Sequence, residues 1–410
     1  MESVTLLRDK RLVLAVTGSI AVYKAVDLAS KLTQLGAVVD VLMSDAAQNF
    51  VTPLTFQSVT GRAAYASMWR LDEHVHHVQL GEQADLLLIA PATANSVAKL
   101  AQGMADNLVT LTALAARCPI LLAPAMDGGM YEHPATQSNL ELLQARGAHI
   151  AGPAQGRMAS GLEGYGRMLE PETIIDHVRV VLGANGPLAG RKVVVTTGPT
   201  REHLDPVRFI SNRSTGKQGL AVARAALDAG ADVILISGPI CERIPDGLTV
   251  VPVETTDEMG EATCSATENA DALFMVAAVA DFRPGTRSET KLKKTEGELW
   301  GAAIGLEPTL DVLSAIKQRR DKTGKPGVVL GFAAETHNAF EYGRDKLLRK
   351  GLDLIAVNDV LEEGAGFEVN TNRVLLLDAN GIVEEIPLQS KSAVAERLVY
   401  HVSRILNQKV

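Results

Sequence analysis

The chain has 410 residues, of which 46% are hydrophobic and 21% charged, and its formal net charge is −8 at pH 7. This composition is that of an ordinary globular protein and excludes general disorder. Because a single hydrophobic core rarely grows beyond about 250–300 residues, we expect two domains. The acidic balance argues against nucleic acid as the main partner, since phosphate backbones require a surplus of Lys and Arg. A small anionic ligand held by a few lysines is still compatible with it.

The three cysteines, Cys118, Cys241 and Cys264, are too few and too widely spaced for a disulfide framework or a Cys-x-x-Cys metal site. The segment from Met1 to Lys10 is charged and lacks the apolar stretch of a secretory signal. No apolar run approaches the roughly 20 residues of a membrane span. We therefore expect a cytoplasmic protein with no membrane partner.

Short β-branched runs alternate with helical segments through the first half of the chain. Strands are predicted at Leu12–Thr17, Val38–Ser44, Asp85–Thr93 and Pro119–Met126, with helices at Ala21–Leu35 and Ala94–Ala101. Continuously apolar strands are typical of a parallel sheet that is covered on both faces. Such a doubly wound sheet binds ligands at the carboxyl ends of its strands.

A second series of strands begins after the loose stretch 183–187, so the predicted domains are residues 1–186 and 187–410. Its strands are predicted at Val193–Thr197, Val233–Ser237, Leu248–Glu254, Ala272–Ala280, Val328–Ala334 and Leu354–Asn358. Arg373–Leu377 and Ile382–Ile386 flank the turn Asp378–Gly381 and predict a β-hairpin. An amphipathic helix is predicted at Ser392–Leu406. The second half is therefore also an α/β domain.

Two turns of the first half have the pattern of a nucleotide site. Gly18–Ala21 follows the first predicted strand and opens a helix. Glycine allows close approach of a ligand, and a helix N-terminus offers N–H groups to a phosphate, although an ordinary turn has the same pattern. Ala90–Asn95 likewise ends a strand and begins a helix. Lying side by side, the two turns would suit one mononucleotide.

Two further segments of the first half could take part in chemistry. His74, His76 and His77 lie close together, but no carboxylate or thiol completes a metal site with recognisable spacing. A surface loop, a general base and a metal ligand are therefore the alternatives for His77. Residues 156–168 form a Gly-rich stretch with two arginines, either a flexible connector or a flap over an anionic substrate.

The first half resembles the FMN-dependent cysteine decarboxylases. The matching segments are Gly18–Ala21, Ser44, His77–Leu80, Ala90–Asn95, Lys99, Ala105–Leu108, Pro124–Met126 and Met130. The resemblance implies a flavodoxin-like doubly wound domain with a catalytic His77. It assigns FMN binding to Gly18, Ser19, Ser44, Thr93, Ala94 and Asn95. In that family the thiol-bearing carbon is oxidised to a thioaldehyde, CO2 leaves, and the hydride returns from the reduced flavin.

The second half resembles the phosphopantothenate–cysteine ligases. The matching segments are Gly198–Glu202, Asp205–Lys217, Ala277–Phe282, Lys291–Lys294, Gly331–Thr336 and Val357–Asp359. Nearly the whole chain thus resembles, in order, the bacterial bifunctional phosphopantothenoylcysteine decarboxylase / phosphopantothenate–cysteine ligases of coenzyme A synthesis. The resemblance implies a Rossmann-like ligase domain. It also implies a homo-oligomer, in which flavin domains form trimers, ligase domains form dimers, and the two together give a dodecamer.

In this family CTP activates the carboxylate of 4'-phosphopantothenate, pyrophosphate leaves, and the amine of cysteine attacks the acyl cytidylate. The negative charge of the phosphates calls for Mg2+ and positioned lysines, although the sequence identifies no metal ligands. The resemblance assigns the acyl intermediate to Arg208 and Asn212. It assigns CTP to Ala277, Asp281, Lys291, Pro308, Thr309, Leu310, Phe332, Lys346 and Lys350.

The residues themselves support part of this assignment. Lys346 and Lys350 stand at positions i and i+4 of one predicted helix, so they share a face, as they would on an ordinary solvated helix. The turn Ser211–Lys217 precedes an Ala-rich helix and is a candidate anion cradle. No Walker A pattern occurs, so a P-loop NTPase is set aside.

Two decarboxylase positions depart from the most familiar form of the family. Asp127 stands where an Asn holds the substrate carboxylate, and Ser160 where a Cys donates a proton. An ionised Asp127 at ~4 Å from that carboxylate would cost about 1 kcal/mol in water and about 4 kcal/mol at an effective dielectric constant of 20, unless it is protonated or its contact is shifted. Serine is a weaker acid than a thiol of pKa ~8.5, so a water or Tyr165 would have to assist.

These departures leave two alternatives to a fully active bifunctional enzyme. One is an active ligase whose flavin domain has lost or altered decarboxylation. The other is a non-catalytic flavoprotein that acts as a regulator. The presence of His77 at the family's catalytic position favours an active enzyme over a non-catalytic regulator.

Overall fold

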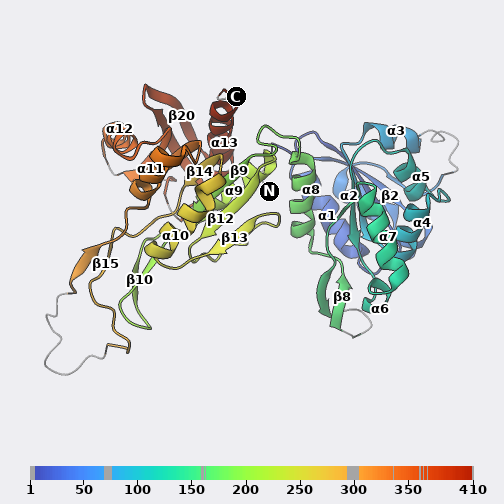
Figure 1. Ribbon diagram of the computed structural model, residues 1–410. Coiled ribbons are helices and arrows are strands. Elements are labelled where there is room, and N and C mark those ends of the chain that lie inside the picture. Colours follow the sequence, from blue (N-terminus) through green and yellow to red (C-terminus); the bar gives the residue numbers. More distant parts are fainter. Residues whose placement is uncertain are drawn as a thin grey trace. The chain divides into compact units, whose positions relative to one another are not determined.

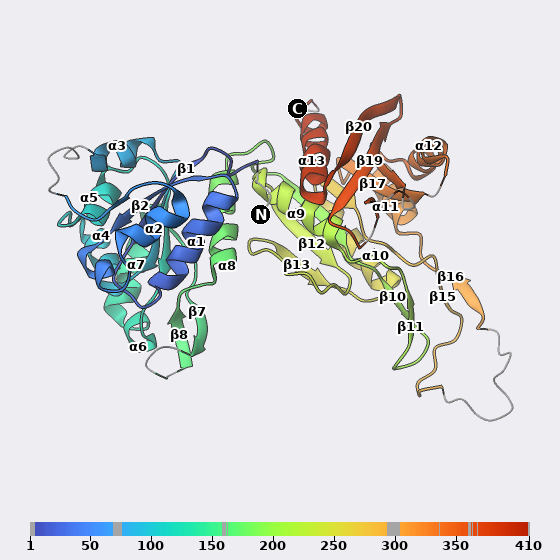
Figure 2. The ribbon, with the colours of Figure 1, turned by 180° about the vertical axis from the view of Figure 1, so that it is seen from behind.

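The computed structural model describes residues 5–68, 76–157, 161, 163–292, 304–335, 337–359, 362, 364–366 and 368–408. The chain divides into two compact units, Met1–Gly183 and Ala184–Val410 (Figures 1 and 2). Each unit is an α/β domain with its own sheet and its own hydrophobic core.

The N-terminal unit is built on a parallel sheet. Its elements are β1 (Arg11–Val16), α1 (Val22–Gln34), β2 (Val38–Met43), η1 (Asp45–Asn49), α2 (Pro53–Thr60), β3 (Ala64–Tyr65), α3 (His76–Gln83), β4 (Leu86–Ala92), α4 (Ala94–Gln102), α5 (Leu108–Ala115), β5 (Ile120–Pro124), α6 (Gly128–Tyr131), α7 (Pro134–Ala145), β6 (His149–Ile150), β7 (Ala154–Arg157), β8 (Glu163–Arg167) and α8 (Pro171–Gly183). The strand order is β3-β2-β1-β4-β5-β6, and all neighbours are parallel.

The predicted doubly wound parallel sheet is confirmed. Its order, 3-2-1-4-5-6, is that of Rossmann sheets, whereas flavodoxin sheets follow 2-1-3-4-5. Both orders reverse direction beside the first strand, and ligands bind at that reversal, outside the carboxyl ends of the strands. In this unit the reversal lies between β1 and β4.

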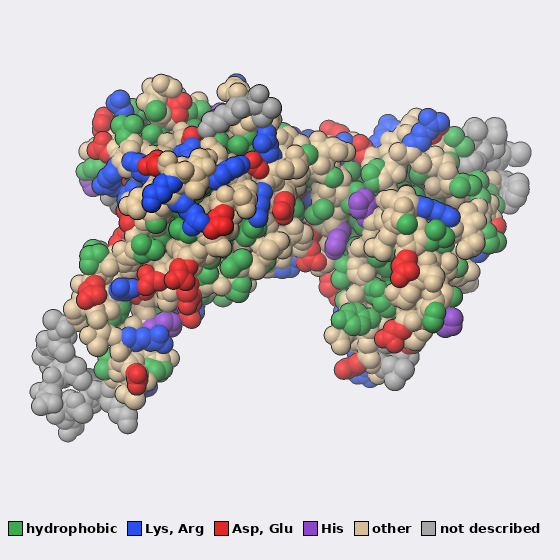
Figure 3. All heavy atoms as spheres, viewed as in Figure 1, with side chains coloured by type: hydrophobic (Ala, Val, Ile, Leu, Met, Phe, Trp, Pro, Cys, Tyr) green, Lys and Arg blue, Asp and Glu red, His purple; other side chains and the backbone are tan. Residues whose placement is uncertain are grey.

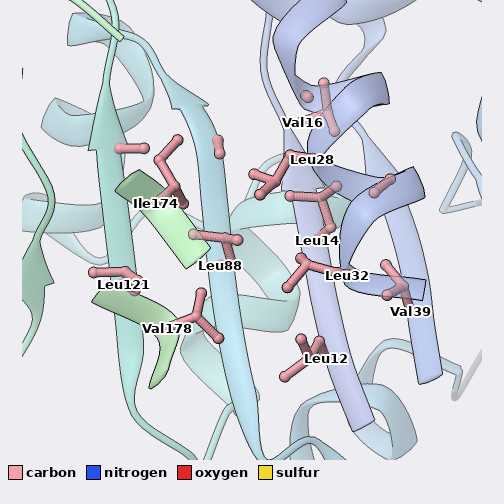
Figure 4. Close-up of a cluster of buried hydrophobic side chains, with 14 of the residues drawn as sticks. Leu12, Leu14, Val16, Leu28, Leu32, Val39, Leu88, Leu121, Ile174 and Val178 are labelled. Atoms are coloured by element: carbon pink, nitrogen blue, oxygen red, sulfur yellow. The ribbon is translucent and has the colours of Figure 1, made fainter. Parts of the chain in front are cut away.

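Successive residues of β1 point to opposite faces of this sheet. Leu14 and Val16 pack against α1 and α8 on one face, with Leu28 among their neighbours (Figure 4). Val13 and Ala15 lie in the core on the other face, which α4, α5 and α7 cover. Because both faces are buried, the strand is apolar at consecutive positions rather than at every second one.

The C-terminal unit carries a larger, mixed sheet. Its elements are β9 (Lys192–Thr197), β10 (Arg201–His203), β11 (Phe209–Ser211), α9 (Lys217–Asp228), β12 (Asp232–Ser237), β13 (Thr249–Pro252), α10 (Thr256–Ala266), η2 (Thr267–Asn269), β14 (Ala272–Met275), β15 (Phe282–Pro284), β16 (Leu306–Pro308), α11 (Val312–Thr323), β17 (Val328–Glu335), α12 (Ala339–Lys350), β18 (Leu354–Asp359), β19 (Thr371–Asp378), β20 (Gly381–Ser390) and α13 (Lys391–Gln408). The order is β13-β12-β9-β14-β17-β18-β19-β20. The predicted hairpin is confirmed as the antiparallel pair β19–β20.

Helices cover both faces of this sheet as well. Val194 and Leu273 of the strands pack with Leu313 of α11 and Leu347 of α12 on one face, together with α10. The helices α9 and α13 pack against each other on the opposite face (Figures 1 and 2). Among the described residues, no helix is both long and apolar enough to cross a membrane.

One predicted strand of this unit is too long. Of Ala272–Ala280, only Ala272–Met275 forms a strand, β14. The Thr196 hydroxyl accepts hydrogen bonds from the N–H groups of Val276 at 3.0 Å and Ala277 at 3.1 Å. These bonds replace those of the sheet and direct residues 276–280 into a loop at the carboxyl edge.

Candidate active sites

The β1–α1 and β4–α4 turns lie next to each other because β1 and β4 are neighbours in the sheet. The buried Thr17 hydroxyl donates to the Pro91 carbonyl at 2.7 Å and accepts from the Thr93 N–H at 3.2 Å, which fixes one turn against the other. The Thr93 hydroxyl caps α4 by accepting from the Ser96 N–H. Helix α1 begins without a side-chain cap, so its first turn has the properties of an anion site.

Gly18 and Ser44 complete the same edge. The Ser44 N–H donates to the Val16 carbonyl at 3.0 Å, and its hydroxyl caps η1. A Cβ on Gly18 would lie 2.5 Å from the Cβ of Ala46, so the turn has room only for glycine. The predicted flavin-binding residues therefore all lie on the carboxyl edge around β1 and β4. They are Gly18, Ser19, Ser44, Thr93, Ala94 and Asn95.

Asp127 lies in the turn after β5, the strand beside β4. Its half-buried carboxylate caps the short helix α6 by accepting from the Gly129 N–H at 3.2 Å. The predicted flap is in part a hairpin of β7 and β8, and the Met126 N–H donates to the Gly166 carbonyl of β8 at 2.9 Å. The base of the hairpin therefore touches the turn that carries Asp127.

A buried lysine holds the segment that follows this hairpin. Lys24 of α1 is 4% exposed, and its Nζ donates to the Met168 carbonyl at 2.8 Å and to the Glu170 carboxylate at 2.9 Å. The positive charge of Lys24 lowers the pKa of the Glu170 carboxyl, against the opposing effect of burial. The helix that follows the Gly18 turn is thus fixed to the segment that follows β8.

Two predicted catalytic groups lie outside the described residues. Ser160 is one, and the side chain of His77 is the other, although the His77 backbone lies in the first turn of α3. Their roles stay predictions.

The C-terminal unit contains a cavity of about 1010 Å³ at the carboxyl edge of its sheet. It is bounded by the start of α9, the loop after β14, the end of β17 and helix α12. Eight of the predicted ligase residues line it: Asn212, Ala277, Asp281, Thr309, Leu310, Phe332, Lys346 and Lys350. Figure 3 shows Lys and Arg side chains intermixed with Asp and Glu on one face of this unit.

Two lysines of α12 give one wall of the cavity its charge. Lys346 donates to the Phe332 carbonyl at 2.9 Å. Burial lowers its pKa, while the carboxylates of Glu335 and Asp281 act in the opposite direction. Lys350 pairs with Asp311 and donates to the Ser314 hydroxyl at 3.1 Å. Lys346 is therefore a desolvated cation facing acidic groups, and such a group is a candidate for binding an anionic ligand.

Asn212 joins two segments at the cavity. Its Nδ2 donates to the carbonyls of Ala278 at 3.0 Å and Val279 at 3.2 Å. The Thr309 hydroxyl donates to the Ala280 carbonyl in the same loop, and its N–H donates to the Asp281 carbonyl at 3.0 Å. Side chains thus hold the loop after β14 on both sides.

The three other predicted ligase residues, Arg208, Lys291 and Pro308, are not among the lining residues. Pro308 ends β16, which pairs with β15. Arg208 lies in the turn between β10 and β11, and its guanidinium binds the fully buried Asp205 carboxylate at 2.9 and 2.5 Å. Arg208 also donates to the carbonyl of Leu292, the residue after Lys291, at 2.7 Å.

Asp205 is the centre of this contact. It accepts from the N–H groups of Val207 at 2.7 Å, Arg208 at 2.9 Å and Leu292 at 3.2 Å. The Arg208 guanidinium, and then these N–H groups, hold the pKa of Asp205 far below its usual range. The carboxylate thereby links the β10–β11 hairpin to the segment that carries Lys291.

Polar residues that the sequence analysis did not assign also line the cavity, among them Asn372 and Lys391, and so does Lys217. Lys217 belongs to the Ser211–Lys217 turn that was predicted as an anion cradle, so its neighbourhood gave a signal. Nothing in the sequence marks Asn372 or Lys391, because they come from β19 and α13, which only the fold brings to the cavity. No group of three or more His, Cys, Asp or Glu side chains in the described ranges could hold a metal ion.

Two doubly wound units with open helix N-termini at their reversal points define a two-domain α/β protein of the nucleotide-binding class. A family model described as Flavoprotein matches residues 1–183, and one described as DNA/pantothenate metabolism flavoprotein C-terminal domain matches residues 188–406. The Coenzyme A biosynthesis bifunctional protein CoaBC of Bacillus subtilis (strain 168) is 41% identical over 408 residues, covering 98% of this chain and 99% of that protein. The chain belongs to this CoaBC family, which confirms the resemblance found in the sequence.

Two further proteins are similar to this chain. The CoaBC protein of Mycobacterium tuberculosis (strain ATCC 25618 / H37Rv) is 42% identical over 402 residues, or 95% of each chain. A crystal structure of the C-terminal domain of a CoaBC protein is 36% identical, covers 54% of this chain and 99% of its own, and has a TM-score of 0.46.

Proposed function

We propose that the chain catalyses two consecutive steps of coenzyme A biosynthesis. The C-terminal unit joins 4'-phosphopantothenate to cysteine with CTP as co-substrate, and the N-terminal unit decarboxylates the product, 4'-phosphopantothenoylcysteine, with FMN to 4'-phosphopantetheine. Membership of the CoaBC family over nearly the full chain supports both steps. The observation that carries the ligase step is the cavity in which Asn212, Asp281 and Lys346 meet.

In the ligase step, the substrate carboxylate attacks the α-phosphorus of CTP and pyrophosphate leaves. Negative charge grows on the phosphate oxygens, and positioned cations stabilise it most where water is excluded. The desolvated Lys346 and its neighbour Lys350 supply such charge. We assign to Asn212 the orientation of the acyl cytidylate while the amine of cysteine attacks it. Arg208 and Lys291 complete the proposed set from the adjoining hairpins.

Two carboxylates of the cavity suit a Mg2+ ion that is bound together with substrate phosphates. Mg2+ commonly binds one or two protein carboxylates together with substrate phosphates and water. Asp281 and Glu335 line the cavity and could provide that limited set. We therefore propose that Mg2+ arrives with the triphosphate and neutralises part of its charge.

The N-terminal edge fits FMN. The uncapped first turn of α1, the Gly18 turn and the hydroxyls of Ser19, Ser44 and Thr93 offer donors for a phosphate and room for its close approach. Bound FMN supplies reversible two-electron redox chemistry. The chain's own residues then bind and orient the substrate and move protons.

We assign these roles by the family pattern and the geometry. His77, as general base, accepts the thiol proton that the substrate loses when its thiol-bearing carbon is oxidised. We assign the substrate carboxylate to Asp127, in the turn after β5, and proton donation to Ser160. The Met126–Gly166 hydrogen bond fixes the β7–β8 hairpin to the Asp127 turn. We also propose a cytoplasmic location and a homo-oligomer, both from the family resemblance.

One assay tests the two steps separately. Purified protein is incubated with 4'-phosphopantothenate, cysteine, CTP and Mg2+, and pyrophosphate, CO2 and 4'-phosphopantetheine are measured. We expect all three products and a yellow protein that contains FMN. Pyrophosphate without CO2 would reject the decarboxylase assignment, and the absence of all three products would reject the ligase assignment. Supplying 4'-phosphopantothenoylcysteine directly tests decarboxylation without the ligase step, and no CO2 from it would reject the decarboxylase assignment. Replacing CTP by ATP measures the nucleotide preference.

A further inference from the structure

One buried carboxylate of the C-terminal unit has no part in the proposed ligase step. Glu202 of β10 is 5% exposed and is not among the residues that line the cavity. Its Oε1 accepts hydrogen bonds from the Thr256 N–H at 2.8 Å and from the Thr256 hydroxyl at 2.7 Å. Burying a carboxylate is costly unless it is hydrogen-bonded, so these two bonds must offset that cost. Glu202 therefore fixes the position of Thr256.

The Thr256 hydroxyl continues a chain of hydrogen bonds. It lies 3.1 Å from the Thr200 hydroxyl, and both side chains are buried. The Thr200 hydroxyl in turn accepts from the Ala280 N–H at 2.9 Å. Ala280 belongs to the loop after β14 and precedes Asp281, which lines the cavity. The chain therefore runs from Glu202 through two threonines to the residue before Asp281.

The carboxylate decides the direction of every bond in this chain. A carboxylate oxygen only accepts, so the Thr256 hydroxyl donates its single proton to Glu202. The Thr200 hydroxyl must then donate to Thr256, and its oxygen accepts from the Ala280 N–H. Hydrogen bonds in a chain polarise one another, and a charged end strengthens them. The buried charge of Glu202 thus holds the Ala280 N–H in one orientation.

Thr309 holds the other end of the same peptide segment. Its hydroxyl donates to the Ala280 carbonyl, and its N–H donates to the Asp281 carbonyl at 3.0 Å. With its N–H bonded to Thr200 and its carbonyl to Thr309, Ala280 has both of its backbone polar groups paired. The backbone that carries the Asp281 side chain is therefore held on both sides.

Asp281 is the functional residue whose placement depends on this arrangement. Its carboxylate opposes the lowering of the Lys346 pKa that burial causes, so the two charged groups lie near each other in the cavity. Glu335, the other carboxylate near Lys346, belongs to β17 and is held by the sheet. A shift of the loop after β14 would therefore move Asp281 relative to Lys346 and leave Glu335 in place.

We propose that this hydrogen-bond chain positions the Asp281 carboxylate for the nucleotide in the ligase step. Its members, Glu202, Thr256 and Thr200, are positioning residues, because none of them lines the cavity. The proposal rests on the proposed ligase function, in which Asp281 binds CTP or the Mg2+ that arrives with it. A misplacement of about 1 Å at a functional group can cost about 10²-fold in rate, so a buried device that fixes one loop residue matters for the reaction.

The test removes one hydroxyl of the chain at a time. Thr200→Val and Thr256→Val keep nearly the same shape and break the chain at successive bonds, whereas Thr200→Ser and Thr256→Ser keep the hydroxyl. Thr255→Val is the matched control, because the Thr255 hydroxyl caps the same helix, α10, by accepting from the Glu258 N–H and is not part of the chain. Calorimetry on the full-length protein measures the affinities for CTP, with and without Mg2+, and for 4'-phosphopantothenate. Pyrophosphate release gives KM and kcat.

We expect each valine variant to bind CTP in the presence of Mg2+ about 10-fold more weakly, with a matching rise in the KM for CTP, because a buried hydrogen bond is lost. The affinity for 4'-phosphopantothenate should stay within twofold of that of the unmodified protein. The serine variants should restore CTP binding. A loss seen only with Mg2+ would support the proposal with Asp281 as a metal ligand, and a loss seen also without Mg2+ would support it with Asp281 in contact with the nucleotide.

CTP affinities within twofold of the Thr255→Val control would overturn the proposal. An equal or larger loss of 4'-phosphopantothenate affinity would also overturn it, and so would serine variants as weak as the valine variants. If Thr256→Val does not fold, Thr200→Val makes the same comparison from outside α10. Pyrophosphate from the unmodified protein together with unaffected valine variants would reject only the positioning role, whereas no pyrophosphate from the unmodified protein would reject the ligase function itself.

Discussion

The two units use the same strand order around their first strand. They carry different side chains on the carboxyl edge of the sheet at that point. Both sheets contain six parallel strands in the order 3-2-1-4-5-6. An uncapped helix follows the first strand in each, α1 directly after β1 and α9 after the β10–β11 hairpin. In the N-terminal unit the edge at this point is formed by small and hydroxyl-bearing residues such as Ser19 and Thr93. In the C-terminal unit it is formed by charged groups such as Lys217 and Lys346. The topology fixes where a ligand binds, and the side chains decide which chemistry follows.

The C-terminal unit also extends the common plan. The antiparallel strands β19 and β20 and the helix α13 follow the six parallel strands. From this extension come Asn372 and Lys391, which have no counterpart in the N-terminal sheet. The added elements thus contribute an amide and a positive charge to the lining of the cavity.

The largest expected effect separates the two units. His77→Asn should reduce CO2 release from phosphopantothenoylcysteine by about 10²–10⁴-fold, because a general base contributes that much. Bound flavin and ligase activity should stay unchanged, since distant sites behave independently. His149→Asn, at an exposed histidine of β6, is the matched control. Unchanged CO2 release in His77→Asn would remove His77 from the mechanism.

The corresponding change in the other unit is Lys346→Met. We expect pyrophosphate formation to fall by about 10²–10³-fold, as it does when one positioned group that stabilises transition-state charge is lost. The visible spectrum of the flavin should not change. Lys322→Met, at an exposed lysine of α11, controls for the loss of a lysine. Equal rates in the two variants would contradict the role given to Lys346.

A matched pair of glycines tests whether the strand order shared by the two units places a ligand site at the same point in each. A Cβ on Gly18 would lie 2.5 Å from Ala46 Cβ, and a Cβ on Gly219 would lie 2.5 Å from Thr197 Cβ. Gly18→Ala should lower flavin content, and Gly219→Ala should lower ligase activity, each with a loss of about 1–3 kcal/mol in the free energy of unfolding of its own unit. Gly305→Ala, where a Cβ meets nothing within 4 Å, is the control. Loss of both activities from either change would mean that the units are coupled.

The smallest effect concerns Asp127. Asn also caps helices well, so Asp127→Asn should keep the cap of α6 intact. Removing a carboxylate beside the substrate carboxylate should tighten binding of phosphopantothenoylcysteine by about 1 kcal/mol, or roughly fivefold. Calorimetry with the substrate measures this. Weaker binding would show that Asp127 is protonated or contacts a different group.

The parts of the fold that depend on apolar runs were predictable from the sequence. The prediction Leu12–Thr17 corresponds to β1 and Ser392–Leu406 to α13, because buried strands and amphipathic helices leave regular patterns. The strand predicted at Ala272–Ala280 was too long, because its apolar letters do not show that Thr196 takes over the N–H groups of residues 276 and 277. A hydroxyl from a neighbouring strand ended β14, and no local signal marks it.

The same division holds for the sites. The family resemblance identified residues that the structure places together, such as Asn212 and Phe332. Both belong to segments that match the family in the same order along the chain. The resemblance could not supply their distances. Arg208, assigned to the acyl intermediate, and Lys291, assigned to CTP, are not among the residues that line the cavity, and their roles stay predictions. Lys391 could not be predicted at all, because a lysine at the start of a helix reads as solvated until the helix is packed.

The buried Asp205 carboxylate has a mechanical consequence. It binds the Arg208 guanidinium in one hairpin and the Leu292 N–H in another segment, and the Ser288 N–H adds a bond to the Leu204 carbonyl at 2.9 Å. Because the pKa of Asp205 is lowered, this contact stabilises the fold above the ordinary carboxyl pKa of about 3.9 and is lost only as the pH falls toward the lower value. At neutral pH the ionised Asp205 carboxylate therefore connects the two segments mechanically. A displacement of Lys291 must carry the β10–β11 hairpin with it.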